Sequence, residues 1–126
     1  MSLPADETTL IFIDLQNRLM PSIFQGEEVL DKCVRIAKIA QLLNVPIVGT
    51  EQSPQSLGNS VVEITPYYQG TFIKEHFDGC QDGLIDQSHK DASHLVLAGC
   101  EAHVCVMQTA LSLIKRGYQI TAPVYP

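Results

Sequence analysis

The chain has 126 residues, of which 45% are apolar and only 17% are charged, and its formal net charge is −6. This length and composition suit one globular domain with a single hydrophobic core. The acidic balance argues against a nucleic-acid partner, because phosphate contacts require clustered Lys and Arg. No apolar run approaches the roughly 20 residues of a membrane span, and residues 1–7 lack the features of a secretory signal. A cytoplasmic location is therefore expected.

Five short runs of apolar and β-branched residues are typical of strands. They occupy residues 8–14, 46–50, 71–74, 94–98 and 119–122. The first run is continuously apolar up to its final carboxylate, and this pattern predicts a strand that is buried on both faces.

Amphipathic helices are predicted between these strands. Residues 27–44 carry apolar side chains at helical spacing with charged residues between them. Residues 101–116 show the same periodicity, and Gly117 stands where a helix C-cap glycine belongs. A short helix is expected at 83–88. Residues 53–69 hold two prolines and a glycine, so they should be mostly loop with a helical turn or two.

Strands that alternate with helices predict an α/β fold of three layers, Rossmann-like, with a mainly parallel sheet of about five strands between helices. Ligands of such sheets bind beyond the carboxyl ends of the strands. Asp14 ends the first predicted strand, Lys74 ends the third, and Cys105 follows the fourth. These three residues are therefore expected at one edge of the sheet.

Each of the three residues also has a structural interpretation. Cys105 lies in or beside a first helical turn, where a thiol pKa is lowered and free N–H groups can hold an oxyanion, but a cysteine in a helix is often a small buried hydrophobe. Asp14 fits an N-cap or turn residue for residues 15–20. Lys74 fits a solvated lysine at a strand end.

A metal site or another cofactor is not predicted. The four histidines are scattered and form no metal-binding motif, and no nucleotide-binding glycine motif is present. The cysteines form no C-x-x-C pair, so free thiols are expected. They are Cys33, Cys80, Cys100 and Cys105.

Four segments together resemble the isochorismatase-like cysteine hydrolase superfamily, and its isochorismatase domain-containing branch in particular. They read Ile-Phe-Ile-Asp-Leu-Gln at 11–16, Gly-Thr-Glu-Gln at 49–52, Lys-Glu-His-Phe at 74–77 and Leu-Ala-Gly-Cys-Glu-Ala-His-Val-Cys-Val at 97–106. The resemblance implies one domain over residues 1–126 that lacks the C-terminal part of the family fold.

The resemblance also implies an active site. Asp14, Lys74 and Cys105 match the positions of the family's catalytic triad, which implies hydrolysis of a small-molecule amide-type C–N bond through a thioester. The backbone N–H groups of Glu101 and Cys105 would form the oxyanion hole. The family's non-proline cis peptide would fall between Cys100 and Glu101.

Further expectations concern the substrate, the metal and the assembly. Gln52, Phe77 and His103 are candidates for substrate contacts. Nicotinamidase relatives carry a metal-binding D-x-H set after the second strand, whereas residues 51–59 hold no histidine, so neither nicotinamidase activity nor a metal is expected here. A homo-oligomer is expected, and the sheet edge would be open, covered by a partner subunit, or compromised.

Two other functions remain open at this point. In the first, the chain is a catalytically inactive family member that acts as an oligomeric scaffold. Alternatively, it would be a thiol redox sensor that pairs Cys105 with Cys100 or Cys80.

Overall fold

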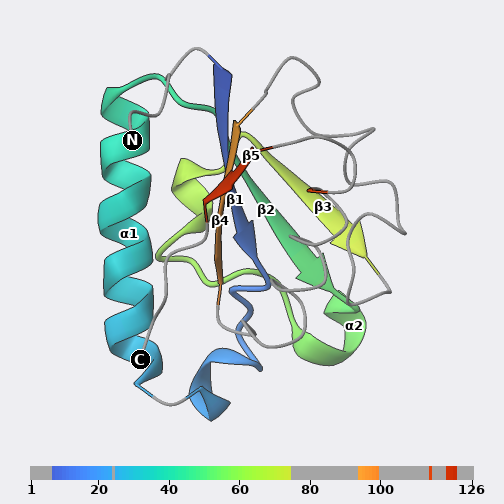
Figure 1. Ribbon diagram of the computed structural model, residues 1–126. Coiled ribbons are helices and arrows are strands. Elements are labelled where there is room, and N and C mark those ends of the chain that lie inside the picture. Colours follow the sequence, from blue (N-terminus) through green and yellow to red (C-terminus); the bar gives the residue numbers. More distant parts are fainter. Residues whose placement is uncertain (1–6, 24, 75–93, 100–113, 115–118, 122–126) are drawn as a thin grey trace.

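A five-stranded parallel sheet forms the centre of the computed structural model, which describes residues 7–23, 25–74, 94–99, 114 and 119–121 (Figure 1). The strand order is β3-β2-β1-β4-β5, and every neighbouring pair runs parallel. This sheet confirms the predicted α/β class. The strands are β1 (Thr8–Ile13), β2 (Ile47–Gln52), β3 (Gly70–Lys74), β4 (His94–Gly99) and β5 (Gln119–Thr121).

Strand β1 lies in the middle of the sheet, and all six of its residues are buried. Alternate side chains of a strand point to opposite faces. Leu10 and Phe12 pack in the core cluster beneath α1, whereas Ile11 and Ile13 are equally buried but lie outside that cluster. Both faces of the sheet are therefore covered at its central strand, in keeping with a three-layer fold. The predicted helices at 83–88 and 101–116 lie outside the described residues, apart from Ile114, which is helical.

Helix α1 (Gly26–Leu42) covers one face of the sheet (Figure 1). Its buried residues recur at helical spacing, and Cys33 is one of them, with no exposed surface. The helix ends in a Schellman motif, in which Asn44 takes φ 58°, Asn44 N–H bonds to Gln41 O and Val45 N–H bonds to Ala40 O. The predicted helix 27–44 was thus placed to within two residues.

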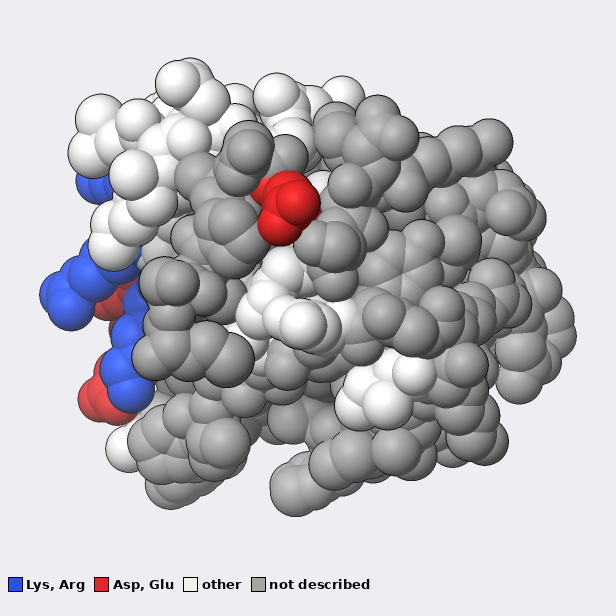
Figure 2. Space-filling view, turned by 45° about the horizontal axis from the view of Figure 1, so that its top comes forward, with Lys and Arg blue, Asp and Glu red and all other residues white. Residues whose placement is uncertain are grey.

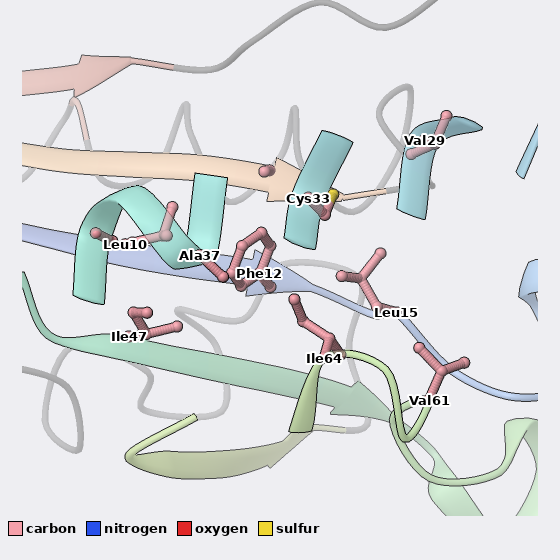
Figure 3. Packing of buried hydrophobic residues seen from close by; sticks show 11 residues of the cluster. Leu10, Phe12, Leu15, Val29, Cys33, Ala37, Ile47, Val61 and Ile64 are labelled. Carbon is pink, nitrogen blue, oxygen red and sulfur yellow. The ribbon is translucent and has the colours of Figure 1, made fainter. Parts of the chain in front are cut away.

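The core between α1 and the sheet is apolar and includes residues that follow β1 and β2 (Figure 3). Leu15 continues the core beyond the end of β1, and Val61 and Ile64 close it from the segment after β2. That segment holds the short helix α2 (Pro54–Leu57) and the 3-10 turn η3 (Thr65–Tyr67). The expected loop with a helical turn or two is confirmed. A further 3-10 turn, η2, covers Met20–Ser22.

The strand order fixes where a ligand crevice can form. The chain moves from β1 to β2 and β3 on one side, and returns to place β4 and β5 on the other side of β1. The order therefore reverses between β1 and β4. In open α/β sheets the crevice lies beyond the carboxyl ends of the strands at such a switch point. Residues that directly follow β1 are consequently the first candidates for a functional site.

Candidate active site

Asp14 is the first residue after β1 and lies at this switch point. Its side chain is completely buried, and its backbone takes the left-handed conformation with φ 58°. This conformation costs a non-glycine residue on the order of 1 kcal/mol, and such costs concentrate at functional sites. The turn at Asp14 directs the chain out of the sheet and leaves the carboxylate at the carboxyl edge.

Thr50 of β2 anchors Asp14 through three hydrogen bonds. The Thr50 hydroxyl donates to Asp14 Oδ1 at 2.8 Å. The Asp14 N–H donates to Thr50 Oγ1 and to Thr50 O, each at 3.2 Å. Thr50 is completely buried as well. The neighbouring strand β2 therefore orients the carboxylate. These contacts differ from those of an N-cap residue, whose side chain would accept from the N–H groups that follow it in the chain.

The register of the sheet shows which predicted site residues come to the same edge. Ile13 pairs with Gly99, so β1 and β4 end side by side, with Asp14 next in the chain. Gln52 pairs with Lys74, so β2 and β3 also end together. The structure thus brings Asp14, Gln52 and the backbone of Lys74 to one edge of the sheet.

The remaining predicted site residues follow β3 and β4 in the chain. They lie outside the described residues, and so does the predicted cis peptide. These residues are Phe77, Cys100, Glu101, His103 and Cys105.

Strand β4 approaches β1 very closely just before this edge. A Cβ atom added to Gly99 would collide with the Ile13 carbonyl oxygen and would lie 2.9 Å from Ile13 Cβ. Only glycine fits this contact, because the backbone atoms that it meets cannot move aside. The close approach sets the starting point of the segment that follows β4.

Two buried polar side chains near the edge were missed by sequence reasoning. Gln16 Nε2 donates to Gln52 O at 3.0 Å and to Gly58 O at 2.6 Å, and its Oε1 accepts from Gln52 N–H at 2.8 Å. Glu51 accepts from Ser60 N–H at 2.6 Å and from Asn59 Nδ2 at 3.2 Å. Both side chains hold the segment after β2 against the strand ends.

Tyr68 lies beneath the site on the α1 face of β2. Its ring stacks on Phe12 with centroids 6.0 Å apart, and a Cβ added to Gly49 would collide with it. Burial raises the pKa of the Tyr68 phenol, and this effect outweighs the opposing effect of the nearby Ser60 hydroxyl, which lacks the geometry of a hydrogen bond. The phenol is therefore held neutral below the site.

The described ranges contain neither a candidate metal centre nor a candidate membrane-spanning helix. There, no three or more His, Cys, Asp and Glu side chains form a group that could hold a metal ion. None of the helices described is long and apolar enough to cross a membrane.

Several solved structures share this fold. A chain described as the MAR1 ribonuclease from Caenorhabditis elegans superposes with a TM-score of 0.89 at 28% identity, over 97% of this chain and 65% of that one. The ycaC gene product of Escherichia coli, described as an octameric hydrolase of unknown specificity, superposes with a TM-score of 0.84 at 18% identity, over 95% of this chain and 63% of that one. The second likeness shows the fold alone.

The sequence is similar to those of several relatives named for the isochorismatase domain or family. Isochorismatase domain-containing protein 2A of Mus musculus is 34% identical over 118 residues, and isochorismatase family protein 1A of Dictyostelium discoideum is 32% identical over 122 residues. Each alignment covers 90% of this chain but only 56% and 59% of those proteins, so the chain spans less than two thirds of their length. The isochorismatase domain model matches residues 8–124. The chain therefore belongs to the isochorismatase family.

Proposed function

We propose that the protein is a cysteine hydrolase that cleaves an amide-type C–N bond of a small molecule, with Asp14, Lys74 and Cys105 as its catalytic residues. Family membership supports a hydrolase in general terms. The observation that carries the finer proposal is the buried Asp14 carboxylate, which Thr50 holds at the switch point beside the end of β4. Burying a carboxylate costs free energy unless it is paired or faces a cleft.

In the proposed reaction Asp14 first accepts the thiol proton of Cys105. The thiolate attacks the amide carbonyl carbon and forms a C–S bond, while the N–H groups of Glu101 and Cys105 stabilise the oxyanion. The C–N bond then breaks as Asp14 returns the proton to the leaving amine. Water attacks the thioester carbonyl with Asp14 accepting its proton. The C–S bond breaks, the acid leaves, and the proton returns to the thiolate.

Lys74 has an electrostatic role in this proposal. Its charge would favour the carboxylate and the thiolate over their neutral forms. The register between Gln52 and Lys74 supports this role, because it brings the last residue of β3 to the edge where Asp14 leaves β1. Gln52, which is buried at the same edge, is the candidate substrate contact among the described residues, and Phe77 and His103 remain further candidates.

A hydrolysis screen against a library of small amides tests this function. The wild-type chain should release amine from at least one amide, and Cys105→Ala should abolish that release. Cys80→Ala is the matched control, because the mechanism gives Cys80 no role. Activity that survives in Cys105→Ala contradicts the proposal. Activity that Cys80→Ala also loses contradicts the mechanism, because the mechanism gives Cys80 no role.

RNA is the second substrate class to include in the screen, because the Caenorhabditis elegans neighbour is described as a ribonuclease. The net charge of −6 argues against this substrate. Figure 2 shows Lys and Arg together with Asp and Glu along one side of the molecule, so the charge on that side is mixed. We expect no cleavage of single-stranded RNA. Cleavage of RNA that depends on Cys105 would make RNA, rather than an amide, the proposed substrate.

We also propose that the protein forms a homo-oligomer. Apolar side chains near the end of α1 support this assembly, since Leu42 is 83% exposed and Ile39 and Leu43 are each 57% exposed. The related fold from Escherichia coli is described as octameric. Light scattering coupled to size exclusion should give a mass well above 13.9 kDa, and Leu42→Glu should lower it. A monomeric wild type contradicts the assembly.

A further inference from the structure

The carboxamide of Gln16 is completely buried and satisfies three backbone groups of other segments. Its Oε1 accepts from Gln52 N–H, and its Nε2 donates to Gln52 O and to Gly58 O. A buried glutamine is uncommon unless its donors and acceptors are satisfied. Here one side chain joins the end of β1, the end of β2 and the segment that follows β2.

These bonds replace a missing part of the β-sheet. The last register pair between β1 and β2 is Ile13 with Thr50, and the chain leaves β1 at the left-handed Asp14. Strand β2 nevertheless continues to Gln52, whose N–H and C=O would then face no strand on the β1 side. The Gln16 carboxamide, with one acceptor and one donor, occupies the place of a peptide group and pairs with both.

The third bond, from Gln16 Nε2 to Gly58 O, also anchors the segment after β2. Gln16 forms a bridge with Ser60 through its backbone, and Asn17 N–H bonds to Asn59 O at 2.9 Å. The bond from Gln16 to Gly58 O, at 2.6 Å, is the buried side-chain counterpart of these contacts. The segment after β2 is therefore anchored to the same residue that aligns the end of β2.

We propose that Gln16 is a positioning residue that aligns the ends of β2 and β3 with Asp14. This role rests on the proposed function, because Gln52 and Lys74 share a register and Asp14 lies two residues before Gln16. Without the carboxamide, Gln52 loses these bonds on the β1 side, and the backbone of Lys74, which is in register with Gln52, is less firmly aligned with the end of β1. Gln16 itself touches backbone groups rather than reacting atoms.

Gln16→Met tests the role, because it keeps the length of the side chain and removes every hydrogen bond. The first readout is hydrogen exchange of the Gln52 amide by NMR. The exchange should be about tenfold faster in the variant, the factor that corresponds to one buried hydrogen bond. The second readout is the alkylation rate of Cys105 by iodoacetamide at pH 6.5, which should fall by about tenfold or more.

Arg18→Met is the matched control. Arg18 Nη1 donates to Ser56 O at 3.0 Å, so it anchors the same segment, but this bond is exposed. The control should leave both the exchange of the Gln52 amide and the labelling of Cys105 within about twofold of wild type, since exposed contacts contribute little.

Gln16→Glu keeps the test informative where the methionine variant does not fold. A glutamate in this place can still accept from Gln52 N–H, but as a carboxylate it would face two carbonyl oxygens without a proton to donate. Burial would raise the pKa of this glutamate, so the folded state holds a proton that the unfolded state releases. The melting temperature should therefore lie closer to that of wild type at pH 5 than at pH 8.

The outcomes separate the two proposals. Unchanged exchange of the Gln52 amide in Gln16→Met overturns the positioning role, and so does a penalty in Gln16→Glu that is independent of pH. Fast labelling of Cys105 in wild type that Gln16→Met retains also overturns it, while the proposed function stands. Slow labelling of Cys105 in wild type contradicts the proposed function and the positioning role together.

Discussion

Thr50→Val removes the hydroxyl that orients Asp14 while it keeps the shape of the buried side chain. The lost hydroxyl donates to Asp14 Oδ1 at 2.8 Å and accepts from Asp14 N–H at 3.2 Å. A hydrogen bond to a charged group contributes about 1.5–3 kcal/mol. We therefore expect the free energy of unfolding to fall by about 2 kcal/mol. For a chain of this size that corresponds to a melting temperature lower by roughly 8 °C.

Thr50→Ser is the matched control, because it keeps the hydroxyl and removes a buried methyl group. Its cost is about 1 kcal/mol from lost burial and a small cavity. Urea unfolding measures both stabilities, and iodoacetamide labelling at pH 6.5 measures the reactivity of Cys105. Labelling should fall about tenfold or more in Thr50→Val and stay close to wild type in Thr50→Ser. Equal labelling in the two variants would refute the idea that the hydroxyl orients the carboxylate.

Three further predictions concern stability. Gly49→Ala should lower the free energy of unfolding by about 1–3 kcal/mol in urea, because the new methyl group collides with the Tyr68 ring; a neutral result would contradict the packing described. Gly99→Ala should cost a similar amount, since it meets the backbone of Ile13, and it should also slow the labelling of Cys105. Above the ordinary tyrosine pKa of about 10, unfolded Tyr68 loses a proton that folded Tyr68 keeps, so stability should fall by about 1.4 kcal/mol per pH unit from this group. Tyr68→Phe should remove that decline and Tyr67→Phe should not, and matching alkaline profiles for the two variants would show that the phenol is not buried.

The sequence was sufficient to predict the sheet and the position of Asp14. The continuous apolar run of β1 predicted a strand buried on both faces, and the carboxylate at its end marked the edge. Helical periodicity located α1, because its buried residues recur at a regular spacing. These features depend on neighbouring residues in the chain, and local patterns therefore reveal them.

Contacts between distant segments could not be predicted in the same way. Strand β2 extends two residues beyond the predicted end, because Glu51 and Gln52 are polar and look like loop residues in the sequence. Ser60 N–H satisfies the buried Glu51 carboxylate, and Gln16, which lies 36 residues from Gln52, pairs with the Gln52 backbone. The partnership of Thr50 with Asp14 spans the same distance. The signals for Gln16 were its position two residues after a buried carboxylate and its place in the family-like segment 11–16.

The labelling rate of each cysteine by iodoacetamide, measured by mass spectrometry from pH 5 to pH 10, tests the catalytic triad most directly. A nucleophilic Cys105 that depends on an acid and an amine should label fast below pH 7, and it should lose this advantage in Asp14→Asn and in Lys74→Ala. Cys80 provides the internal reference in every sample. If Cys105 labels like Cys80, with a midpoint near the free-thiol value of about 8.5, the three residues do not act together and the proposed hydrolase mechanism is wrong.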